Sequence, residues 1–326
     1  LSHKDVLQAL PPSDCAEVMA RALAAHARGE AYMPLRSMMR PPEAAGLMGL
    51  MPSWRAGRRG EDAVFALKAI CVIPTNPTRG LDAHQGVVTL FAGETGVPAA
   101  ILDASAVTEV RTAAVSAVAT RVLAREDAAV LAILGAGVQA RAHLTAISQA
   151  RPLREVRVYS PTRAHAQAIA DQASRLGVEA TVSANAEQAV RDADLIVVAT
   201  NSREPVLRRE WIARGTHVNA VGASTPSARE LDTATIADGA LFVDSRESLR
   251  NEAGEYLLAV REGAIAGEAH VRAELGEVLA GLRDGRRDDE ELTVFRSLGL
   301  AVEDLAAAEY AVSAARRLGL GTEVAL

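Results

Sequence analysis

Short apolar stretches follow one another in the first third of the chain with no helical segment between them. They predict strands at residues 33–40, 46–51, 64–73, 86–92 and 98–103. An amphipathic pattern predicts a helix before these strands, at 14–28, and a long helix after them, at 105–124. A run of strands bounded by helices is typical of an α+β domain and not of a nucleotide-binding fold.

From residue 127 onward the pattern changes to a strict alternation of strands and helices. Strands are predicted at 129–134, 155–159, 179–182, 195–199, 217–221 and 241–244, and helices at 140–149, 163–175 and 186–191 separate the first four. Six strands in this arrangement predict a doubly wound parallel sheet, so the expected class is α/β. Residues 246–291 are expected to be mostly helical, with a possible strand at 292–297.

An amphipathic helix is predicted at 301–318, and we expect it to return to the N-terminal half. The α+β domain would then be discontinuous. The predicted boundaries are 1–115 plus 305–326 for this domain and 116–304 for the doubly wound domain.

A glycine-rich turn lies between the first strand of the alternating part and its first helix. Gly135 permits a tight turn, Gly137 lets backbone N–H groups approach a pyrophosphate, and Ala140 lets the helix pack closely on the strand. The helix N-terminus adds partial positive charge. This context predicts a Rossmann dinucleotide site, for which the candidates are Gly135, Gly137, Val138 and Gln139. The alternative is a tight turn that binds nothing.

The end of the second strand indicates which dinucleotide is preferred. A site for NAD usually places Asp or Glu there to bind the ribose 2′-hydroxyl. Here the position holds Ser160, followed after Pro161 by Thr162 and Arg163. Hydroxyl and guanidinium groups suit a 2′-phosphate, so we predict NADPH/NADP rather than NADH. The alternative is that Arg163 is only a solvated residue in the first turn of the next helix.

Composition excludes several classes of protein. The 326 residues are 49% hydrophobic and 23% charged, with a formal net charge of −6, which argues against a nucleic-acid partner. No apolar run reaches the roughly 18 residues of a membrane span, and the N-terminus lacks the pattern of a signal peptide. The two cysteines then indicate a reducing, cytoplasmic setting. No His/Cys cluster with metal spacing and no G-x-S-x-G motif occurs, so neither a metal site nor acyl-enzyme chemistry is predicted.

Eight ordered stretches carry a resemblance to a known family. They are MPLR (33–36), GLMP (49–52), ALKAI (66–70), EVRTAAVSAVAT (109–120), ILGAGVQA (133–140), THVNAVGAS (216–224), AELGEV (273–278) and TVFRSLGLAVED (293–304). Nearly end to end, the chain resembles the ornithine cyclodeaminase/mu-crystallin family. The resemblance implies a homodimer joined through the sheets of its N-terminal, substrate-binding domains, with a separate nucleotide domain in each subunit.

Three cations fall on family positions that bind the substrate carboxylate: Arg36, Lys68 and Arg111. Elementary physical chemistry agrees with this assignment. A lysine in the apolar run around residue 68 is costly unless it meets an anion, and the planar fork of Arg111 suits a carboxylate. The alternatives are an internal ion pair for Lys68 and a solvated charge at a strand edge for Arg36.

The resemblance also implies the positions around the cofactor and the reacting atoms. His84, which joins Lys68 and Arg111 as a catalytic candidate, matches a position near the substrate, where it could donate a proton or merely bond a backbone carbonyl. The remaining implied contacts are Thr112 and Gln139 near the cofactor phosphates, Val221, Gly222 and Ser224 beside the nicotinamide and substrate, and Ser297 to Gly299 closing the cofactor cleft.

Two departures from the family pattern bear on the activity. Cyclodeaminases carry an Asp where this chain has Ser224, and a Glu where it has Gly49. Releasing an amine requires acid–base groups. Because neither Ser224 nor Gly49 carries a carboxyl group, ornithine cyclodeamination is not expected. Ser224 resembles the ketimine-reducing, mu-crystallin-like branch.

The sequence therefore predicts NADPH-dependent reduction of a C=N bond in a cyclic ketimine carboxylate, such as pyrroline-2-carboxylate or piperideine-2-carboxylate. An imine formed from a 2-oxo acid and an amine is a related substrate. Positioning would supply most of the catalysis, because a protonated imine is already a good electrophile. The alternatives are an amino-acid dehydrogenase, an ornithine or lysine cyclodeaminase with other machinery, and a non-enzymatic NADPH-linked binding protein.

Overall fold

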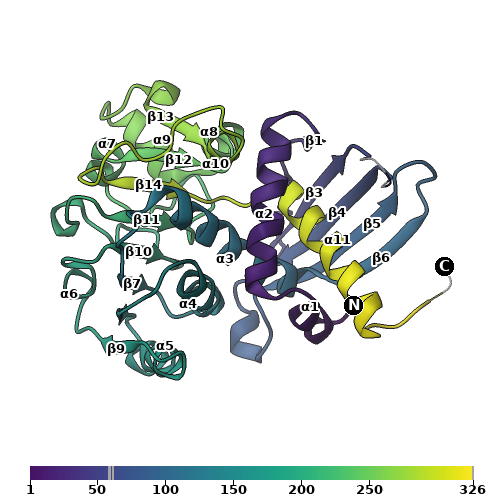
Figure 1. Cartoon of the computed structure of the whole chain (residues 1–326), viewed down its shortest axis with the longest axis horizontal. Helices are drawn as coiled ribbons and strands as arrows, with labels where there is room; N and C mark the ends of the chain where they lie inside the picture. Colours follow the sequence, from purple (N-terminus) through teal and green to yellow (C-terminus); the bar gives the residue numbers. More distant parts are fainter. Residues whose placement is uncertain (58–59, 61, 325–326) are drawn as a thin grey trace. The chain divides into compact units, whose positions relative to one another are not determined.

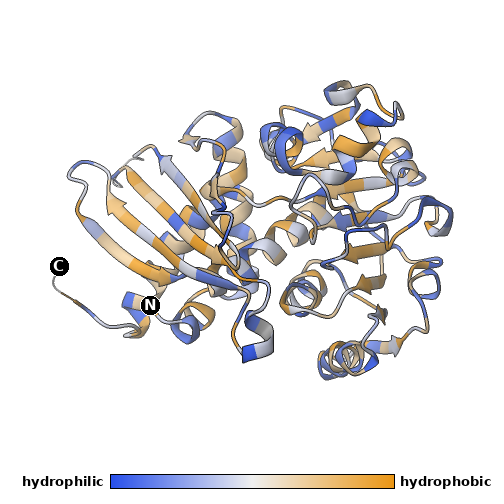
Figure 2. Ribbon diagram, turned by 180° about the vertical axis from the view of Figure 1, so that it is seen from behind, coloured by the Kyte–Doolittle hydropathy of each residue, from blue (hydrophilic) through white to orange (hydrophobic). Residues whose placement is uncertain are grey.

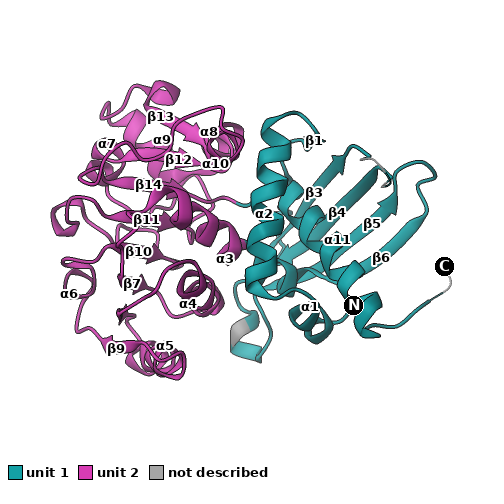
Figure 3. Ribbon diagram, in the orientation of Figure 1, with its two compact units in different colours: residues 1–111, 299–326 teal, residues 112–298 magenta. Residues whose placement is uncertain are grey.

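A computed structural model describes residues 1–57, 60 and 62–324 of the chain. It divides into two compact units, coloured separately in Figure 3. One unit contains residues 1–111 and 299–326, and the other contains residues 112–298. The sequence analysis placed the two boundaries a few residues later, at 115 and 304.

The first unit is built on an antiparallel sheet with the strand order β1-β3-β4-β5-β6, in which β2 also pairs with β3 (Figure 1). The long strands pair residue by residue, so that Lys68 on β4 lies between Met51 on β3 and Val88 on β5. The strands are β1 (Ala31–Tyr32), β2 (Ser37–Met39), β3 (Leu47–Arg55), β4 (Val64–Val72), β5 (His84–Ala92) and β6 (Pro98–Asp103), with a short 3₁₀ turn η1 (Asn76–Arg79) between β4 and β5.

Helices of this unit pack against one another and against the sheet. α11 (Ala301–Leu318), from the end of the chain, contacts α2 (Pro12–Ala27) and strands β3, β4 and β5. α1 (His3–Ala9) contacts α11 and β6. The sequence analysis missed α1, which is short and begins at a capping box between Ser2 and Asp5. Of the single strand predicted at 33–40, only β2 forms, and the short β1 lies just before that range.

The two faces of the antiparallel sheet differ in exposure. On one face, formed by alternate residues of each strand, the side chains are buried; examples are Met51, Ala66 and Val88. Figure 2 views the sheet from its other side, where apolar positions run along the strands. Four large apolar side chains that are 37% to 47% exposed come from four strands: Leu50, Phe65, Val87 and Ile101. Monomeric proteins rarely expose an apolar sheet face of this kind.

The second unit contains a parallel sheet of eight strands in the order β13-β12-β14-β11-β10-β7-β8-β9. Its faces are covered by helices, and an apolar core lies on each side. The strands are β7 (Val130–Leu134), β8 (Glu155–Tyr159), β9 (Glu179–Val182), β10 (Leu195–Val198), β11 (His217–Ala220), β12 (Ala240–Val243), β13 (Val271–Glu274) and β14 (Thr293–Arg296). The doubly wound α/β class predicted from the sequence is thus confirmed.

Helices and short turns connect these strands. They are α3 (Ala104–Leu123), whose first residues belong to the other unit, α4 (Val138–Ala150), α5 (Arg163–Arg175), α6 (Ala186–Val190), η2 (Arg209–Trp211), α7 (Thr233–Asp238), α8 (Arg246–Glu252), α9 (Gly254–Arg261), η3 (Gly267–His270) and α10 (Leu275–Leu279). Within the described part of the chain, no helix combines the length and the apolar character needed to cross a membrane.

The sheet has two strands more than the six that the alternating pattern predicted. One is β14, at the possible strand 292–297. The other is β13, inside a stretch that we expected to be mostly helical. Only Val271 and Ala273 of its four residues are buried, and charged residues alternate with them. In the sequence, an alternating pattern of only four residues cannot be distinguished from the charged helical segments around it.

Candidate functional site

The glycine turn has the geometry that a dinucleotide site requires. Gly135 follows β7 with φ +111°, and its N–H donates to the Tyr159 carbonyl of β8 over 2.9 Å. A Cβ on Gly135 would lie 2.3 Å from the Ala199 carbonyl oxygen beyond β10. β7 and β10 are neighbours at the point where the strand order reverses, which is where open α/β sheets bind ligands.

The next glycine leaves space for a ligand. Gly137 precedes the first residue of α4, is exposed, and would have no protein atom within 4 Å of an added Cβ. Val138 and Gln139, in the first turn of α4, are half-buried. The N-terminus of this 13-residue helix has no side-chain cap. A pyrophosphate group therefore fits the open side of the turn, where backbone N–H groups and the helix dipole would meet it.

The residues expected to decide between the two dinucleotides follow the second parallel strand, β8. Ser160 directly follows β8 and is half-buried, whereas Thr162 and Arg163 are exposed at the start of α5. No carboxylate occurs from Ser160 to Arg163.

Two further strand ends carry residues expected near the nicotinamide or closing the cofactor cleft. Val221 is half-buried after β11, and Gly222 and Ser224 are exposed beyond it. Ser297 follows β14 and is only 2% exposed. Thr112, another residue expected near the cofactor, is buried on α3. These residues belong to the same unit as the glycine turn.

The other unit brings two of the predicted cations together. Lys68 and Arg111 are 3% and 4% exposed. Lys68 Nζ lies 2.7 Å from Asp304 Oδ2, and Arg111 Nε lies 3.0 Å from Asp304 Oδ1. Arg111 Nη1 also contacts Glu303 Oε2 at 2.9 Å. One carboxylate thus joins a strand lysine to a helix arginine, and the internal ion pair considered for Lys68 is present.

The surroundings of Lys68 are polar as well as charged. Lys68 Nζ, besides its contact with Asp304, donates to the Thr108 hydroxyl over 3.4 Å. Burial lowers the pKa of Lys68, the Asp304 charge raises it, and the Arg111 and Arg36 charges lower it, leaving it at about 8. Burial would raise the pKa of Asp304, but Lys68 and Arg111 outweigh that effect and bring it below its usual value.

Arg36 and His84 lie near this pair. Arg36, half-buried before β2, is close enough for its charge to act on Lys68. His84 begins β5 and shares a sheet face with Lys68 and Val88. Partial desolvation and then the Lys68 charge lower the pKa of His84, so its neutral form predominates at neutral pH. Its backbone carbonyl accepts a hydrogen bond from the Ser105 hydroxyl.

Sequence reasoning missed the two carboxylates. Glu303 and Asp304 stand in the first turn of α11, where acidic residues ordinarily complement the helix dipole. Both are at most 1% exposed, which a helix-dipole role does not require. The signal that could have found them was their place on a predicted amphipathic helix returning to the lysine-bearing domain.

Gly49 lies on the sheet face that carries Lys68, and Gly299 lies against Arg111. Gly49, where cyclodeaminases carry a Glu, is on β3 on the same sheet face as Met51, the partner of Lys68. Gly299 has φ +81°, and a Cβ there would lie 2.6 Å and 2.7 Å from the two terminal nitrogens of Arg111. The glycine therefore fixes where the guanidinium can lie.

Replacing Gly299 by alanine is expected to displace the Arg111 guanidinium and to lower turnover of a carboxylate substrate by about 10- to 100-fold. Gly319 is the matched control, because it has φ +66° and no atom within 4 Å of an added Cβ. Both variants carry left-handed backbone strain, and only one touches Arg111. Steady-state kinetics and thermal unfolding of the two variants separate the effects. Equal losses of activity would contradict the role of Gly299.

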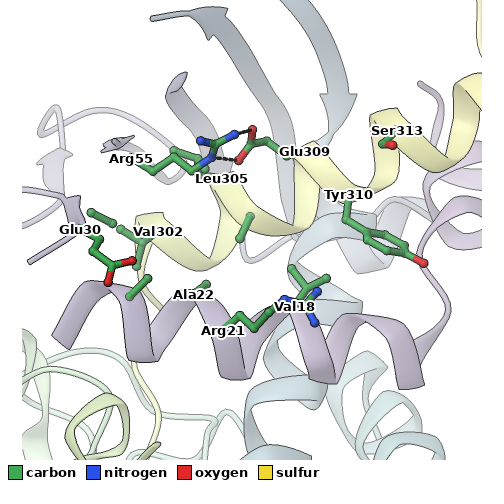
Figure 4. Close-up of a pocket in the computed structure, with 13 residues that line it drawn as sticks. Val18, Arg21, Ala22, Glu30, Arg55, Val302, Leu305, Glu309, Tyr310 and Ser313 are labelled. Carbon is green, nitrogen blue, oxygen red and sulfur yellow. Dashed lines mark hydrogen bonds and ion pairs between the residues drawn. The ribbon is translucent and has the colours of Figure 1, made fainter. Parts of the chain in front are cut away.

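A concavity of about 430 Å³ lies between α2 and α11 (Figure 4). Its floor is apolar, with Val18, Ala22 and Leu305, and its rim holds an ion pair in which Arg55 donates twice to Glu309, each over 2.6 Å. None of the residues predicted to bind substrate or cofactor lines it. Within the described residues, no group of three metal-binding side chains occurs.

Comparison with known proteins identifies the family. A model of the ornithine cyclodeaminase/mu-crystallin family matches residues 1–317. The mouse protein named ketimine reductase mu-crystallin is 38% identical over 281 residues, covering 86% of this chain and 84% of its own length.

Two solved structures are similar over nearly the whole chain. One is a Δ1-pyrroline-2-carboxylate reductase from Thermococcus litoralis in complex with NADH and L-proline, with TM-score 0.94 and 36% identity over 99% of each chain. The other is an archaeal alanine dehydrogenase dimer with bound NAD, with TM-score 0.93 and 33% identity over 100% of this chain and 98% of that one. The chain therefore belongs to the ornithine cyclodeaminase/mu-crystallin family.

Proposed function

We propose that the protein is an oxidoreductase that uses a reduced nicotinamide dinucleotide, with NADPH preferred, to reduce the C=N bond of a cyclic ketimine carboxylate. The observation that carries the proposal is the buried Lys68–Asp304–Arg111 cluster. Lys68 and Arg111 face the two carboxylates Asp304 and Glu303, and the charge of Arg36 acts on Lys68 as a third cation, so one positive charge is left for a single anionic group. The names and ligands of the similar proteins, a ketimine reductase and a reductase bound to NADH and L-proline, support the same activity.

Each unit has a separate task in this proposal. Residues 112–298 hold the dinucleotide through the turn at Gly135 and Gly137 and through Ser160, Thr162 and Arg163. Residues 1–111 and 299–326 hold the substrate carboxylate through Arg36, Lys68 and Arg111. When bound, the reduced dinucleotide supplies a hydride. The product is a secondary amino acid such as proline or pipecolate.

The chain's own residues act mainly by positioning. The three cations orient the carboxylate, which fixes the adjacent imine carbon. The imine nitrogen carries its proton into the reaction as an iminium, so the charge that disappears on reduction is already on the substrate. Ser224 in place of Asp, and Gly49 in place of Glu, leave no carboxyl group at either position to donate a proton to a departing amine. His84 is neutral at neutral pH. One of its ring nitrogens can therefore accept a proton from the substrate, and the other can donate its N–H.

The test is a substrate panel. Loss of reduced-dinucleotide absorbance is measured with pyrroline-2-carboxylate and piperideine-2-carboxylate, and in parallel with pyruvate plus ammonia. Ornithine and lysine are tested with oxidised dinucleotide. We expect turnover of at least one cyclic ketimine, at a kcat/KM well above that for pyruvate plus ammonia. A folded protein that reduces neither cyclic ketimine would refute the proposal, and preferred use of pyruvate and ammonia would indicate an amino-acid dehydrogenase.

The preference for NADPH gives a separate prediction. Replacing Ser160 by aspartate places a carboxylate where a 2′-phosphate would lie, and is expected to weaken NADPH binding about 10- to 100-fold while improving or preserving NADH binding. Dissociation constants for both dinucleotides, measured on the wild type and the variant, check this. A wild type that prefers NADH, or a variant with an unchanged ratio, would contradict the assignment.

We also propose that two copies of the chain pair through the open face of the antiparallel sheet. Leu50, Phe65, Val87 and Ile101 form an exposed apolar surface there, which monomers rarely present. The similar alanine dehydrogenase is a dimer. Light scattering of the wild type should give twice the mass of one chain. The Phe65→Glu variant should give the mass of a single chain.

A further inference from the structure

Three charged side chains are buried at the carboxyl ends of the parallel strands, and the proposed chemistry uses none of them. Glu230 and Arg296 are 0% exposed, and Glu255 is 1% exposed. Glu230 lies between β11 and α7, Glu255 lies on α9, and Arg296 ends β14. Charged residues are almost never buried so completely unless they are paired or hydrogen-bonded.

Glu230 connects the ends of two neighbouring strands. Its Oε1 accepts a hydrogen bond from the Thr200 backbone N–H over 2.6 Å and another from the Thr200 hydroxyl over 2.7 Å. Its Oε2 accepts one from the Ala223 backbone N–H over 2.9 Å. Thr200 follows β10 and Ala223 follows β11. One carboxylate therefore binds both segments at the edge of the sheet where such folds receive their ligands.

The segment after β11 lies directly against this carboxylate. A Cβ on Gly222 would lie 2.5 Å from Glu230 Oε1 and 2.1 Å from the Thr200 carbonyl oxygen. The contact leaves no room for a side chain between the two strand ends. The position of residues 221–224, which we assign to the nicotinamide end of the dinucleotide, thus depends on the Glu230 side chain.

Glu230 is itself held in place by the other two charged residues. Its backbone N–H donates to Glu255 Oε1 over 2.9 Å, and Arg296 Nε donates to Glu255 Oε2 over 3.2 Å. Arg296 Nη1 donates to the carbonyl oxygens of Ala220, over 2.8 Å, and Ser297, over 2.7 Å. The network reaches the ends of β10, β11 and β14, and the expected contacts with the nicotinamide end of the dinucleotide follow two of these strands, β11 and β14.

We propose that Glu230 is a positioning residue for the dinucleotide. Its ionised carboxylate holds residues 221–224 against Thr200 in the conformation that receives the nicotinamide end. This inference rests on the proposed dinucleotide site of residues 112–298. A purely structural role would stabilise the unit without changing its affinity for a dinucleotide at constant fold.

Protonation of Glu230 provides an independent measure of the role. Burial raises the pKa of Glu230 to about 7, although the hydrogen bonds from Thr200 and the charge of Arg296 lower it and Glu255 raises it further. A protonated carboxyl carries a donor, and three donors already point at its oxygens. Affinity for the dinucleotide is therefore expected to fall as the pH decreases through about 7.

The experiment compares the wild type with Glu230→Gln and Glu262→Gln. Glutamine keeps the size of the side chain but turns an amide donor toward the N–H group of either Thr200 or Ala223, which bond different oxygens of the carboxylate. Glu262 is the control, because it bonds Arg229 and Thr233 from an exposed position of the same unit. Dissociation constants for NADH and NADPH are measured by calorimetry at about one pH unit below and above pH 7, together with thermal unfolding.

We expect Glu230→Gln to weaken binding of the preferred dinucleotide about 10- to 100-fold at the higher pH and to abolish the wild type's loss of affinity at the lower pH. Glu262→Gln should match the wild type in both. A folded Glu230→Gln protein with wild-type affinity and pH dependence would overturn the inference alone. If the variant does not fold, a wild-type affinity for NADH that is constant across this range overturns it. A wild type that binds neither dinucleotide would overturn the dinucleotide site and this inference together.

Discussion

Replacing Lys68 by methionine is expected to lower kcat/KM for a cyclic ketimine carboxylate by at least about 100-fold. Methionine keeps much of the side-chain volume in the buried position but removes the ammonium group. Arg111 still binds Asp304 through Nε, so the carboxylate of α11 keeps one partner. The loss should therefore arise from the missing contact with the substrate. Steady-state kinetics with saturating reduced dinucleotide measure it.

The only other lysine provides the control. Lys4 is exposed on α1, and Lys4→Met should leave kcat/KM unchanged. The dinucleotide dissociation constant of Lys68→Met should also equal that of the wild type, because the glycine turn and Ser160, which are proposed to hold the dinucleotide, belong to the other unit. A folded Lys68→Met enzyme that retains kcat/KM within about threefold would show that the ammonium group does not hold the substrate.

Replacing Asp304 by asparagine is expected to be costly in two ways, the first of which is stability. Lys68 and Arg111 would lose a buried negative charge that contacts both, and removing one member of a buried ion pair typically costs about 3–5 kcal/mol in the free energy of unfolding. Because the folded pKa of Asp304 is below its usual value, the wild type has this contribution above about pH 4 and loses it at lower pH. Chemical denaturation at neutral pH measures the difference.

The second effect of Asp304→Asn is on the pH dependence of anion binding. The wild-type Lys68 pKa of about 8 includes a raising contribution from Asp304, so the pKa should be lower in the variant. Affinity for a carboxylate falls as Lys68 loses its proton, and the fall should therefore begin at lower pH. The affinity is measured as inhibition by pyrrole-2-carboxylate at a series of pH values. The ring nitrogen of this probe is not basic and adds no titration in this range.

Glu309→Gln on the same helix is the control for Asp304→Asn. Glu309 pairs with Arg55 in a partly exposed position away from the cations, so the pH profile of inhibition should remain that of the wild type. If Asp304→Asn left the pH profile of inhibition unchanged, Lys68 would not be the titrating group. If it left stability unchanged, the buried ion pair would not contribute to folding.

The sequence was sufficient for the features that depend on local pattern. The apolar run before Gly135, the glycine spacing and the helix after it predicted a strand, a turn and a helix that the structure confirms. The absence of a carboxylate at Ser160 is also readable from the sequence. Each of these signals lies within a few consecutive residues, where backbone conformation is decided by the residues themselves.

Features that depend on long-range pairing could not be predicted. Lys68 was recognised as a lysine that needs an anion, yet nothing near it in the sequence identifies Asp304, which arrives from the last helix of the chain. Glu230 was missed for a similar reason, because its partners Thr200 and Ala223 come from two separate strand ends. The partners of a buried charge come from distant parts of the sequence, so they are identified from the three-dimensional structure.

The most direct test of the account is the structure of the ternary complex with oxidised dinucleotide and L-proline. We predict that the proline carboxylate lies within hydrogen-bond distance of Lys68 Nζ and the guanidinium groups of Arg36 and Arg111, with its α-carbon facing the reactive carbon of the nicotinamide. A carboxylate bound by other residues, or cations that face away from the nicotinamide, would contradict the proposal.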